Sequence, residues 1–371
     1  MALQFLNQSP SGIGSSDRRI IRSHRRSTKK QKTELKHLLY ASGSGYVMPR
    51  PLDSESTVLM HRWFFDISDA LFPLQFCTKF DIIKSICVNY ILADEAYFHS
   101  TLAISSNIVS KTLHHFSQAY ALVNIKLSGP FSVSDSAIAA VVSLAIYQQV
   151  HHQPATGPVH LHGLYCMIQL RGGIARLMQE NRALALKSLR LDVELAMQNG
   201  THTLFRSDEV PVHMVLCDPD VCSGQFPRAA SWMPPIMLDL LKLDPLDYTE
   251  TLVSLLYHLV DVSPLGYPSS EPGGRYIDMT YLAMLAFMTT LLPEYNRDGS
   301  SCPLLSDRLG SALQDLCVTA SESSDFDSPL LLWILFISGI SVLDLKDYRW
   351  LSPLIADTCE RLELDNWAFI Q

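Results

Sequence analysis

The stretch from Asp135 to Leu177 constrains the fold most, because it places two long apolar runs on either side of a proline-containing break. The first run spans Ala137 to Val150, and the second spans Val159 to Arg171. The break holds two prolines and a glycine, and each proline pushes the residue before it away from helical angles. Each run is long enough for a helix of three or more turns. The stretch therefore predicts a helical hairpin that is largely buried on both arms.

The second run carries the signals of a helix that ends at a glycine pair. Four apolar residues recur at the i, i+3, i+4 and i+7 spacing of one helical face, namely Leu161, Leu164, Tyr165 and Ile168. Arg171 is placed to interact with the last helical carbonyls, and Gly172 can adopt the left-handed conformation that closes a helix. The Gly172-Gly173 pair is thus interpreted as a helix terminator and a close packing point.

The rest of the body also reads as helices. Apolar residues recur at helical spacing between Gly, Pro and Asn-Gly interruptions, and no stretch alternates with the period of two that marks a half-buried strand. The sequence predicts an all-α body with helices at Thr57–Leu71, Phe80–Ala93, Asp94–Ser110, Lys111–Leu127, Ile174–Met197, Pro235–Lys242, Pro245–Val262, Tyr276–Leu292, Ser306–Ala320, Pro329–Leu343 and from Trp350 onward.

Charge separates an N-terminal arm from this body. The formal net charge is −8, yet the segment from Arg18 to Lys36 holds nine Lys or Arg and one acid, Glu34, which gives +8 and leaves −16 for the remainder. We expect a flexible basic arm over residues 1–57 and one large helical regulatory domain over residues 58–371. The basic side chains that mark the arm are Arg18, Arg19, Arg22, Arg25, Arg26, Lys29, Lys30 and Lys32.

Three interpretations of the basic arm stay open. Its paired Arg and Lys residues fit a nuclear-import signal, which would place the protein in the nucleus. The same charges could make salt-sensitive, non-specific contacts with nucleic-acid phosphates, although no aromatic residue is interleaved for base stacking. A solvated charged tail without a partner is the third.

The sequence offers no metal or disulfide framework. Its eight cysteines contain no Cys-x-x-Cys pair and are interpreted as small buried thiols in a reducing compartment, at Cys77, Cys87, Cys166, Cys217, Cys222, Cys302, Cys317 and Cys359. His151, His152, His160 and His162 are close in sequence, but residues two apart on a helix do not share a face, and no acid lies between Gln148 and Met178. We expect neither a metal site nor a cofactor.

Catalytic and membrane signatures are likewise missing. The chain lacks the glycine patterns of phosphate and dinucleotide loops, and it lacks Gly-x-Ser-x-Gly and His-Glu-x-x-His. No catalytic residue is therefore assigned, although an unrecognised enzyme or a helical small-molecule-binding protein remains the alternative. The apolar segment Leu330 to Leu343 falls short of the roughly 20 residues that span a bilayer. It is interpreted as a core helix, and no membrane partner is expected.

Four segments, taken in order, resemble the fungal-specific transcription factor domain. Ile20–His24 is similar to the "V-R-S-H" arm of that family, and Glu95–Ala103 is similar to its early helix. Pro329–Gly339, which includes Trp333, resembles its C-terminal "P-L-L-W … G-G" helix. The closest correspondence is to the "H-L-x-G-L … L-R-G-G" hairpin, carried by His160, Leu161, Gly163, Leu164, Leu170, Arg171, Gly172 and Gly173.

This resemblance, which spans about Ile20 to Leu343, implies a helical regulatory domain that is not an enzyme. It implies other transcription regulators, or a second copy of the chain, as partners. Members of the family usually read DNA through six cysteines that hold two zinc ions, and the spacing of that cluster is absent here. The expected function is transcription regulation through partner contacts, without a zinc-cluster module for sequence-specific DNA recognition.

Overall fold

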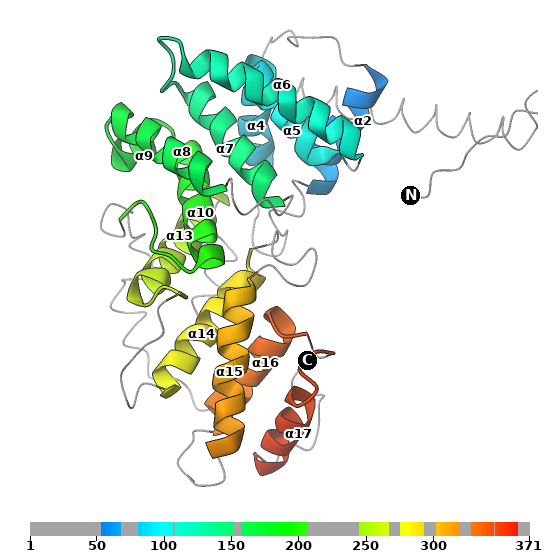
Figure 1. Ribbon diagram of the computed structural model, residues 1–371, viewed down its shortest axis with the longest axis vertical. Helices are drawn as coiled ribbons and strands as arrows, with labels where there is room; N and C mark the ends of the chain where they lie inside the picture. Colours follow the sequence, from blue (N-terminus) through cyan, green and yellow to red (C-terminus); the bar gives the residue numbers. More distant parts are fainter. Residues whose placement is uncertain are drawn as a thin grey trace, which may run out of the picture. The chain divides into compact units, whose positions relative to one another are not determined.

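The computed structural model describes residues 53–67, 81–106, 108–150, 157–206, 245–266, 275–292, 302–319, 328–344 and 346–362. Within these ranges the protein consists of thirteen α-helices and one π-helical turn, and it contains no strand (Figure 1). The prediction of an all-α body is confirmed. Residues 1–52 of the expected arm and the helix expected at Pro235–Lys242 lie outside the described residues, whereas Ser54 to Thr57, expected in the arm, form the start of the first described helix.

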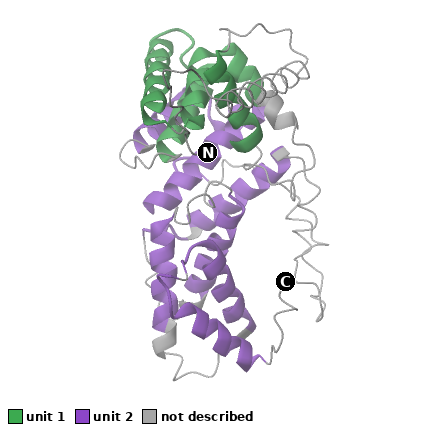
Figure 2. Ribbon diagram, turned by 90° about the vertical axis from the view of Figure 1, so that its right-hand side faces the viewer, with its two compact units in different colours: residues 1–69, 81–150 green, residues 70–80, 151–371 purple. Residues whose placement is uncertain are grey.

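The chain divides into two compact units at the break inside the expected hairpin (Figure 2). Among the described residues, unit 1 comprises 53–67, 81–106 and 108–150, and unit 2 comprises those from 157 onward. The two arms of the hairpin therefore belong to different units. The first arm is buried along most of its length, as expected, whereas the second buries one face and exposes the other.

Unit 1 is built around a helix that is buried on nearly every side. Its central helix, α5, contacts every other element of the unit. The elements are α2 (Ser54–Arg62), the π-helical turn η1 (Trp63–Ile67), α4 (Asp81–Ala93), α5 (Glu95–Ser105), α6 (Val109–Leu127) and α7 (Asp135–Val150).

Helix α5 buries polar side chains only where each has a partner. The hydroxyls of Ser100, Thr101 and Ser105 donate to the carbonyl four residues earlier, over 2.8–2.9 Å. The buried carboxylate of Asp94 caps the helix by accepting from the Tyr97 N–H at 2.9 Å. Its second oxygen pairs with Lys126 of α6. Because unpaired buried polar groups are costly, this arrangement fixes α6 against α5.

Unit 2 is centred on α10. This helix contacts α8, α9, α13 and α15. The elements of the unit are α8 (Gly157–Arg171), α9 (Ile174–Glu180), α10 (Arg182–Asn199), α13 (Pro245–Val262), α14 (Arg275–Thr290), α15 (Pro303–Thr319), α16 (Ser328–Ser341) and α17 (Leu351–Arg361).

The single helix expected over Ile174–Met197 is in fact two helices. Asn181 leaves the helical region, with φ −152° and ψ 78°, and its side chain accepts from the Leu184 N–H at 3.2 Å. An Asn side chain that caps the next helix competes with continuation of the previous one, so the chain breaks without Gly or Pro. Arg182 then bridges Asp247 and Glu250, which joins the start of α10 to α13.

Two glycines allow a close approach of backbones in unit 2. Gly200 closes α10 with φ +68°, and its carbonyl accepts from the Gly266 N–H at 2.9 Å. A Cβ built on Gly200 would lie 2.7 Å from the Gly266 nitrogen, and a Cβ on Gly266 would lie 2.4 Å from the Gly200 carbonyl oxygen. Neither position has room for a side chain while this contact persists.

The buried carboxylate of Asp192 ties α10 to the following loop and to α13. It accepts from the N–H groups of Leu204 and Phe205 at 2.9–3.0 Å, and the Tyr257 hydroxyl donates to it at 2.7 Å. Burial raises the pKa of Asp192, and the three donors oppose that shift by favouring the charged form. Tyr257 also lies 3.3 Å from the Leu189 carbonyl, so its hydroxyl has a second acceptor.

We expect Asp192→Ala to lower the free energy of unfolding by about 2–4 kcal/mol, because it leaves buried donors without an acceptor. Asp192→Asn keeps one accepting oxygen and removes the buried charge, so its loss should be about 1 kcal/mol. Chemical denaturation of the two variants beside the wild type measures the difference. Equal losses for Ala and Asn would contradict the role given to the carboxylate oxygens.

Candidate interaction surface

The family-motif glycines at the end of α8 form a helix-terminating turn. The Gly173 N–H donates to the Ile168 carbonyl at 2.9 Å, and the Gly172 N–H donates to the Gln169 carbonyl at 3.0 Å. Gly172 has φ +111° and Gly173 has φ +90°. These two bonds, with a positive φ at the first residue after the helix, constitute a Schellman motif. The interpretation of the glycine pair as a helix terminator is confirmed.

Arg171 links the two helices that this turn connects. Its guanidinium donates to Glu180 Oε2 at 2.8 and 3.0 Å, and Arg176 donates to Glu180 Oε1 at 2.8 Å. Hydrogen bonds from Arg176 and Arg171 lower the pKa of Glu180. The Leu-Arg-Gly-Gly segment therefore sets the direction in which α9 leaves α8.

The remaining motif residues do not gather into one site. Leu161 and Leu164 are buried and His160 is half-buried, whereas Gly163 is exposed and Leu170 is 80% exposed. Trp333 is half-buried in α16. The eight arm residues predicted to contact an import receptor or nucleic acid, Arg18 to Lys32, lie outside the described residues.

The two motif glycines Gly163 and Gly172 should respond oppositely to alanine. A Cβ at Gly163 meets nothing within 4 Å, so Gly163→Ala should raise the free energy of unfolding by about 0.5–1 kcal/mol through helix propensity. In Gly172→Ala the alanine must hold a positive φ, so this substitution should lower the free energy of unfolding by about 1–2 kcal/mol. Thermal and urea unfolding of the pair provides the measurement. A stabilised Gly172→Ala variant would refute the Schellman assignment.

The histidines near the break do not form a metal site in the part of the chain that is described. His162 is exposed and stacks on Tyr165 with ring centroids 6.4 Å apart, while burial lowers the pKa of His160. No group of three or more His, Cys, Asp or Glu within the described ranges could hold a metal ion. His151 and His152 lie outside those ranges.

The cysteines are less uniformly buried than expected. Cys87 and Cys302 are buried thiols, and burial raises the pKa of Cys302 to about 11. Cys166 is exposed on α8, so it departs from the expected pattern. Cys166 lies two residues from each of the buried Leu164 and Ile168, so it falls on the exposed side of the helix. The many apolar residues of this run do not indicate which side Cys166 takes.

Unit 1 contains a histidine pair that the sequence did not reveal. The Nδ1 atoms of His99 in α5 and His115 in α6 lie 3.0 Å apart, so one ring must donate and the other accept. Burial lowers the pKa of His115, the neighbouring His114 lowers it further, and Glu55 and Asp53 act in the opposite direction. The partners come from two helices, and nothing in the local pattern of either one indicates the contact.

The lowered pKa values of His115 and His160 predict a loss of stability in mild acid. Each ordinary pKa is 6.5, and below that value the unfolded chain binds these protons more readily than the folded chain does. Stability is therefore present above pH 6.5 and is lost as pH falls through the lowered pKa values. We expect His115→Gln and His160→Gln each to flatten the decline of melting temperature between pH 7 and 5. An unchanged decline in both variants would contradict this account.

Helix α6 exposes an apolar stripe, which we term the α6 seam and define as Val109, Leu113, Phe116, Tyr120 and Leu127. Successive members are three, four or seven residues apart, so they share one face of the helix. Val109 is 74% exposed and Leu113 is 50% exposed, while Phe116 is half-buried and stacks on Tyr147 of α7 at 4.3 Å. The sequence pattern predicts this helix and contains the spacing of the stripe, but it does not indicate that the stripe stays exposed.

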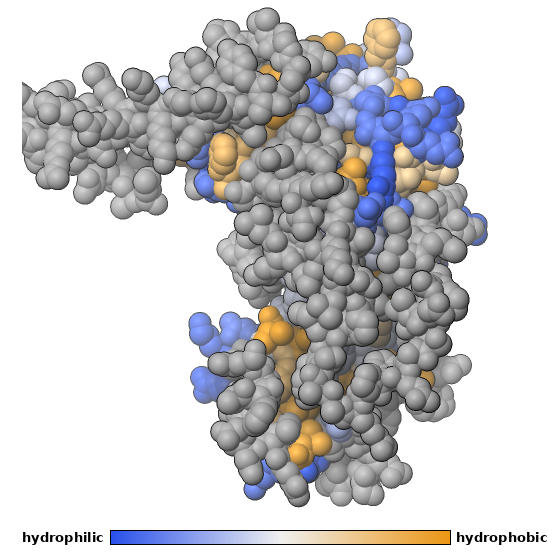
Figure 3. Space-filling model, turned by 180° about the vertical axis from the view of Figure 1, so that it is seen from behind, coloured by the Kyte–Doolittle hydropathy of each residue, from blue (hydrophilic) through white to orange (hydrophobic). Residues whose placement is uncertain are grey.

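Other exposed apolar side chains are more scattered. In unit 2, Ile277 and Met284 of α14 and Ile340 of α16 are exposed. Figure 3 shows apolar surface among polar surface at the height of α14 to α17. Among the described residues, no other helix exposes as many large apolar side chains as α6 does. The α6 seam is therefore the strongest candidate for an interaction surface.

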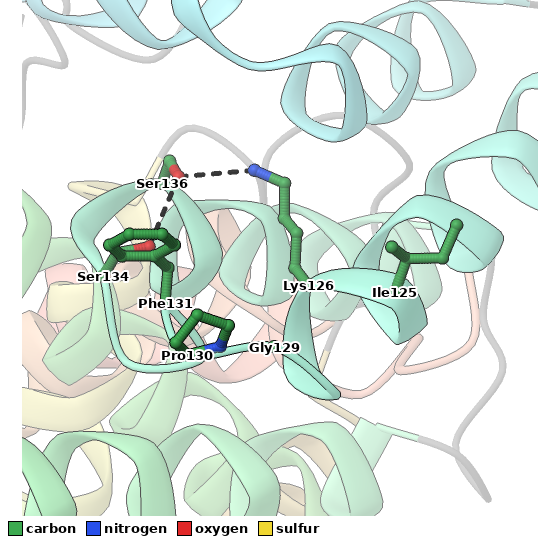
Figure 4. A pocket seen from close by; sticks show the side chains of 7 residues that line it. All are labelled: Ile125, Lys126, Gly129, Pro130, Phe131, Ser134 and Ser136. Atoms are coloured by element: carbon green, nitrogen blue, oxygen red, sulfur yellow. Dashed lines mark hydrogen bonds between the residues drawn. The ribbon is translucent and has the colours of Figure 1, made fainter.

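A small pocket lies where α6 turns into α7 (Figure 4). It has a volume of about 460 Å³ and is lined by Ile125, Lys126, Gly129, Pro130, Phe131, Ser134 and Ser136. The Lys126 ammonium donates to Ser136 Oγ at 3.3 Å and pairs with Asp94, so its charge is already compensated. The pocket is open and offers an apolar rim, formed in part by the exposed ring of Phe131.

No family model matches the chain, and searches of curated proteins and of solved structures return no match. Within the described ranges, no helix combines the length and the apolar character needed to cross a bilayer.

Proposed function

We propose that this protein is a nuclear transcription regulator that acts through partner contacts of its helical body. The sequence contains no zinc-cluster spacing of cysteines, and DNA is reached through a DNA-bound regulator that contacts this body. The observation that carries the proposal is the α6 seam, because exposed apolar side chains that share one face of a helix are typical of a protein–protein interaction site. The ordered resemblance to the fungal-specific transcription factor domain supplies the regulatory context.

The charge division of the chain supports the same function. A basic arm with paired Arg and Lys residues precedes an acidic body. Such a cluster is the kind of address that import receptors read, and an acidic body has little affinity for nucleic acid by itself. In this proposal the arm serves nuclear import and the body binds partners.

Replacing Arg25, Arg26, Lys29 and Lys30 with Ala should abolish nuclear accumulation of a fluorescent fusion. The matched control exchanges Arg for Lys and Lys for Arg at the same four positions, which keeps the charge and should keep the nuclear signal. Tethering residues 53–371, which keep α2 and its Asp53 cap whole, to a reporter promoter should change its output severalfold. A cytoplasmic wild-type fusion together with a silent tethered body would contradict the proposal.

The pocket beside Phe131 favours a second candidate, a helical protein that binds a small apolar ligand. Its volume lies in the range of ligand pockets, roughly 300–1,000 Å³. Such pockets normally enclose most of the ligand, whereas this one is open to solvent. The second candidate therefore ranks below the regulator, and the tethered reporter separates the two, since a small-molecule binder has no reason to change promoter output.

A further inference from the structure

The α6 seam has the spacing of a two-stranded helical interface. If Leu113 is given position a of a heptad, positions a are Leu113, Tyr120 and Leu127, and positions d are Val109, Phe116 and Val123. Every a and d position of the helix is thus apolar, as knobs-into-holes packing requires. Unit 1 itself covers only part of this set, because Val123 is buried while the three a residues are exposed.

The residues beside the seam determine what can pack against it. At the g positions Thr112 and Ala119 are buried against unit 1 and Lys126 is paired with Asp94, which leaves the e side open. The e positions are Ser110, Ser117 and Asn124, all exposed, small or medium in size, and uncharged. Charged e and g residues normally select between partners and orientations, and here the open flank carries none.

The charges of α6 are also compensated within unit 1. The helix contains no Asp or Glu, and its two lysines are paired, Lys111 with Glu55 and Lys126 with Asp94. A two-fold contact brings identical surfaces together, so any net charge on the seam would repel itself. A seam that is apolar, flanked by uncharged side chains and free of uncompensated lysine charge meets that condition.

We propose that the α6 seam pairs with the α6 seam of a second copy of this chain, forming a two-fold symmetric dimer. The inference rests on the proposed function of partner binding and assigns the α6 seam to self-association, so the contact with a DNA-bound regulator falls on another part of the body. A basic or acidic partner would find no complementary charge along the open flank. An identical seam supplies apolar knobs at the same spacing and small flanking residues that allow close approach.

The test is the oligomeric state of the full chain in solution, measured by light scattering and by sedimentation over a dilution series. We expect a dimer for the wild type. Leu113→Glu and Tyr120→Glu each place two like charges in the seam and should raise the dimer Kd by roughly 30-fold or more. Ile125→Glu is the matched control, because Ile125 is an exposed apolar residue of the same helix at position f, 70% exposed and away from the seam.

Helical circular dichroism and melting temperature show whether each variant is folded, and Leu113 and Tyr120 are exposed enough to accept Glu without unfolding unit 1. A wild type that stays monomeric at every concentration would overturn the inference, and so would a Leu113→Glu variant that dimerises as tightly as the wild type. The purified dimer is measured without a promoter. A dimer with a silent tethered reporter would thus refute the proposed regulatory function alone.

Discussion

Asp192 carries a carboxylate into the interior of unit 2, and the need to solvate that charge organises the elements around it. Two backbone N–H groups and the Tyr257 hydroxyl replace the lost water, and they come from the loop after α10 and from α13. A buried charge with these donors holds its neighbours in one arrangement, because any other arrangement leaves a donor or the carboxylate unpaired. Because α10 also contacts α8, α9 and α15, holding α10 in place also fixes where these three helices pack.

Asp94 has the same role in unit 1, with a different result. Its carboxylate caps α5 and pairs with Lys126, while Glu55 pairs with Lys111 near the other end of α6. These anchors, with the stacking of Phe116 on Tyr147, fix the rotation of α6 about its own axis. The rotation turns Leu113 and Leu127 outward. The interaction surface is therefore a consequence of how the buried Asp94 is satisfied, together with the exposed Glu55–Lys111 pair.

Sequence patterns predicted the elements well and their surroundings less well. The apolar run of α7 and the glycine that ends α8 are local signals, because an almost uniformly apolar run and a glycine at a helix end can both be read from residues close in the chain. The break at Asn181 went unpredicted, since an Asn cap competes with helix continuation through a single side-chain bond. Periodicity also identified α6 without indicating that its apolar face stays exposed, because the covering elements are distant in sequence. The His99–His115 pair could not be predicted for the same reason.

The contact between Gly200 and Gly266 has a consequence for how this sequence can vary. The backbone of each glycine lies where a side chain of the other would be, so it leaves no room for one. The two residues lie in separate connecting segments of unit 2. A side chain at either position would clash with the backbone of the other, so neither glycine can be replaced unless that backbone moves. A substitution at a neighbouring residue does not remove this clash. Related chains that keep this packing are expected to carry glycine at both places, and chains that lose one glycine are expected to differ in the whole connection between α13 and α14.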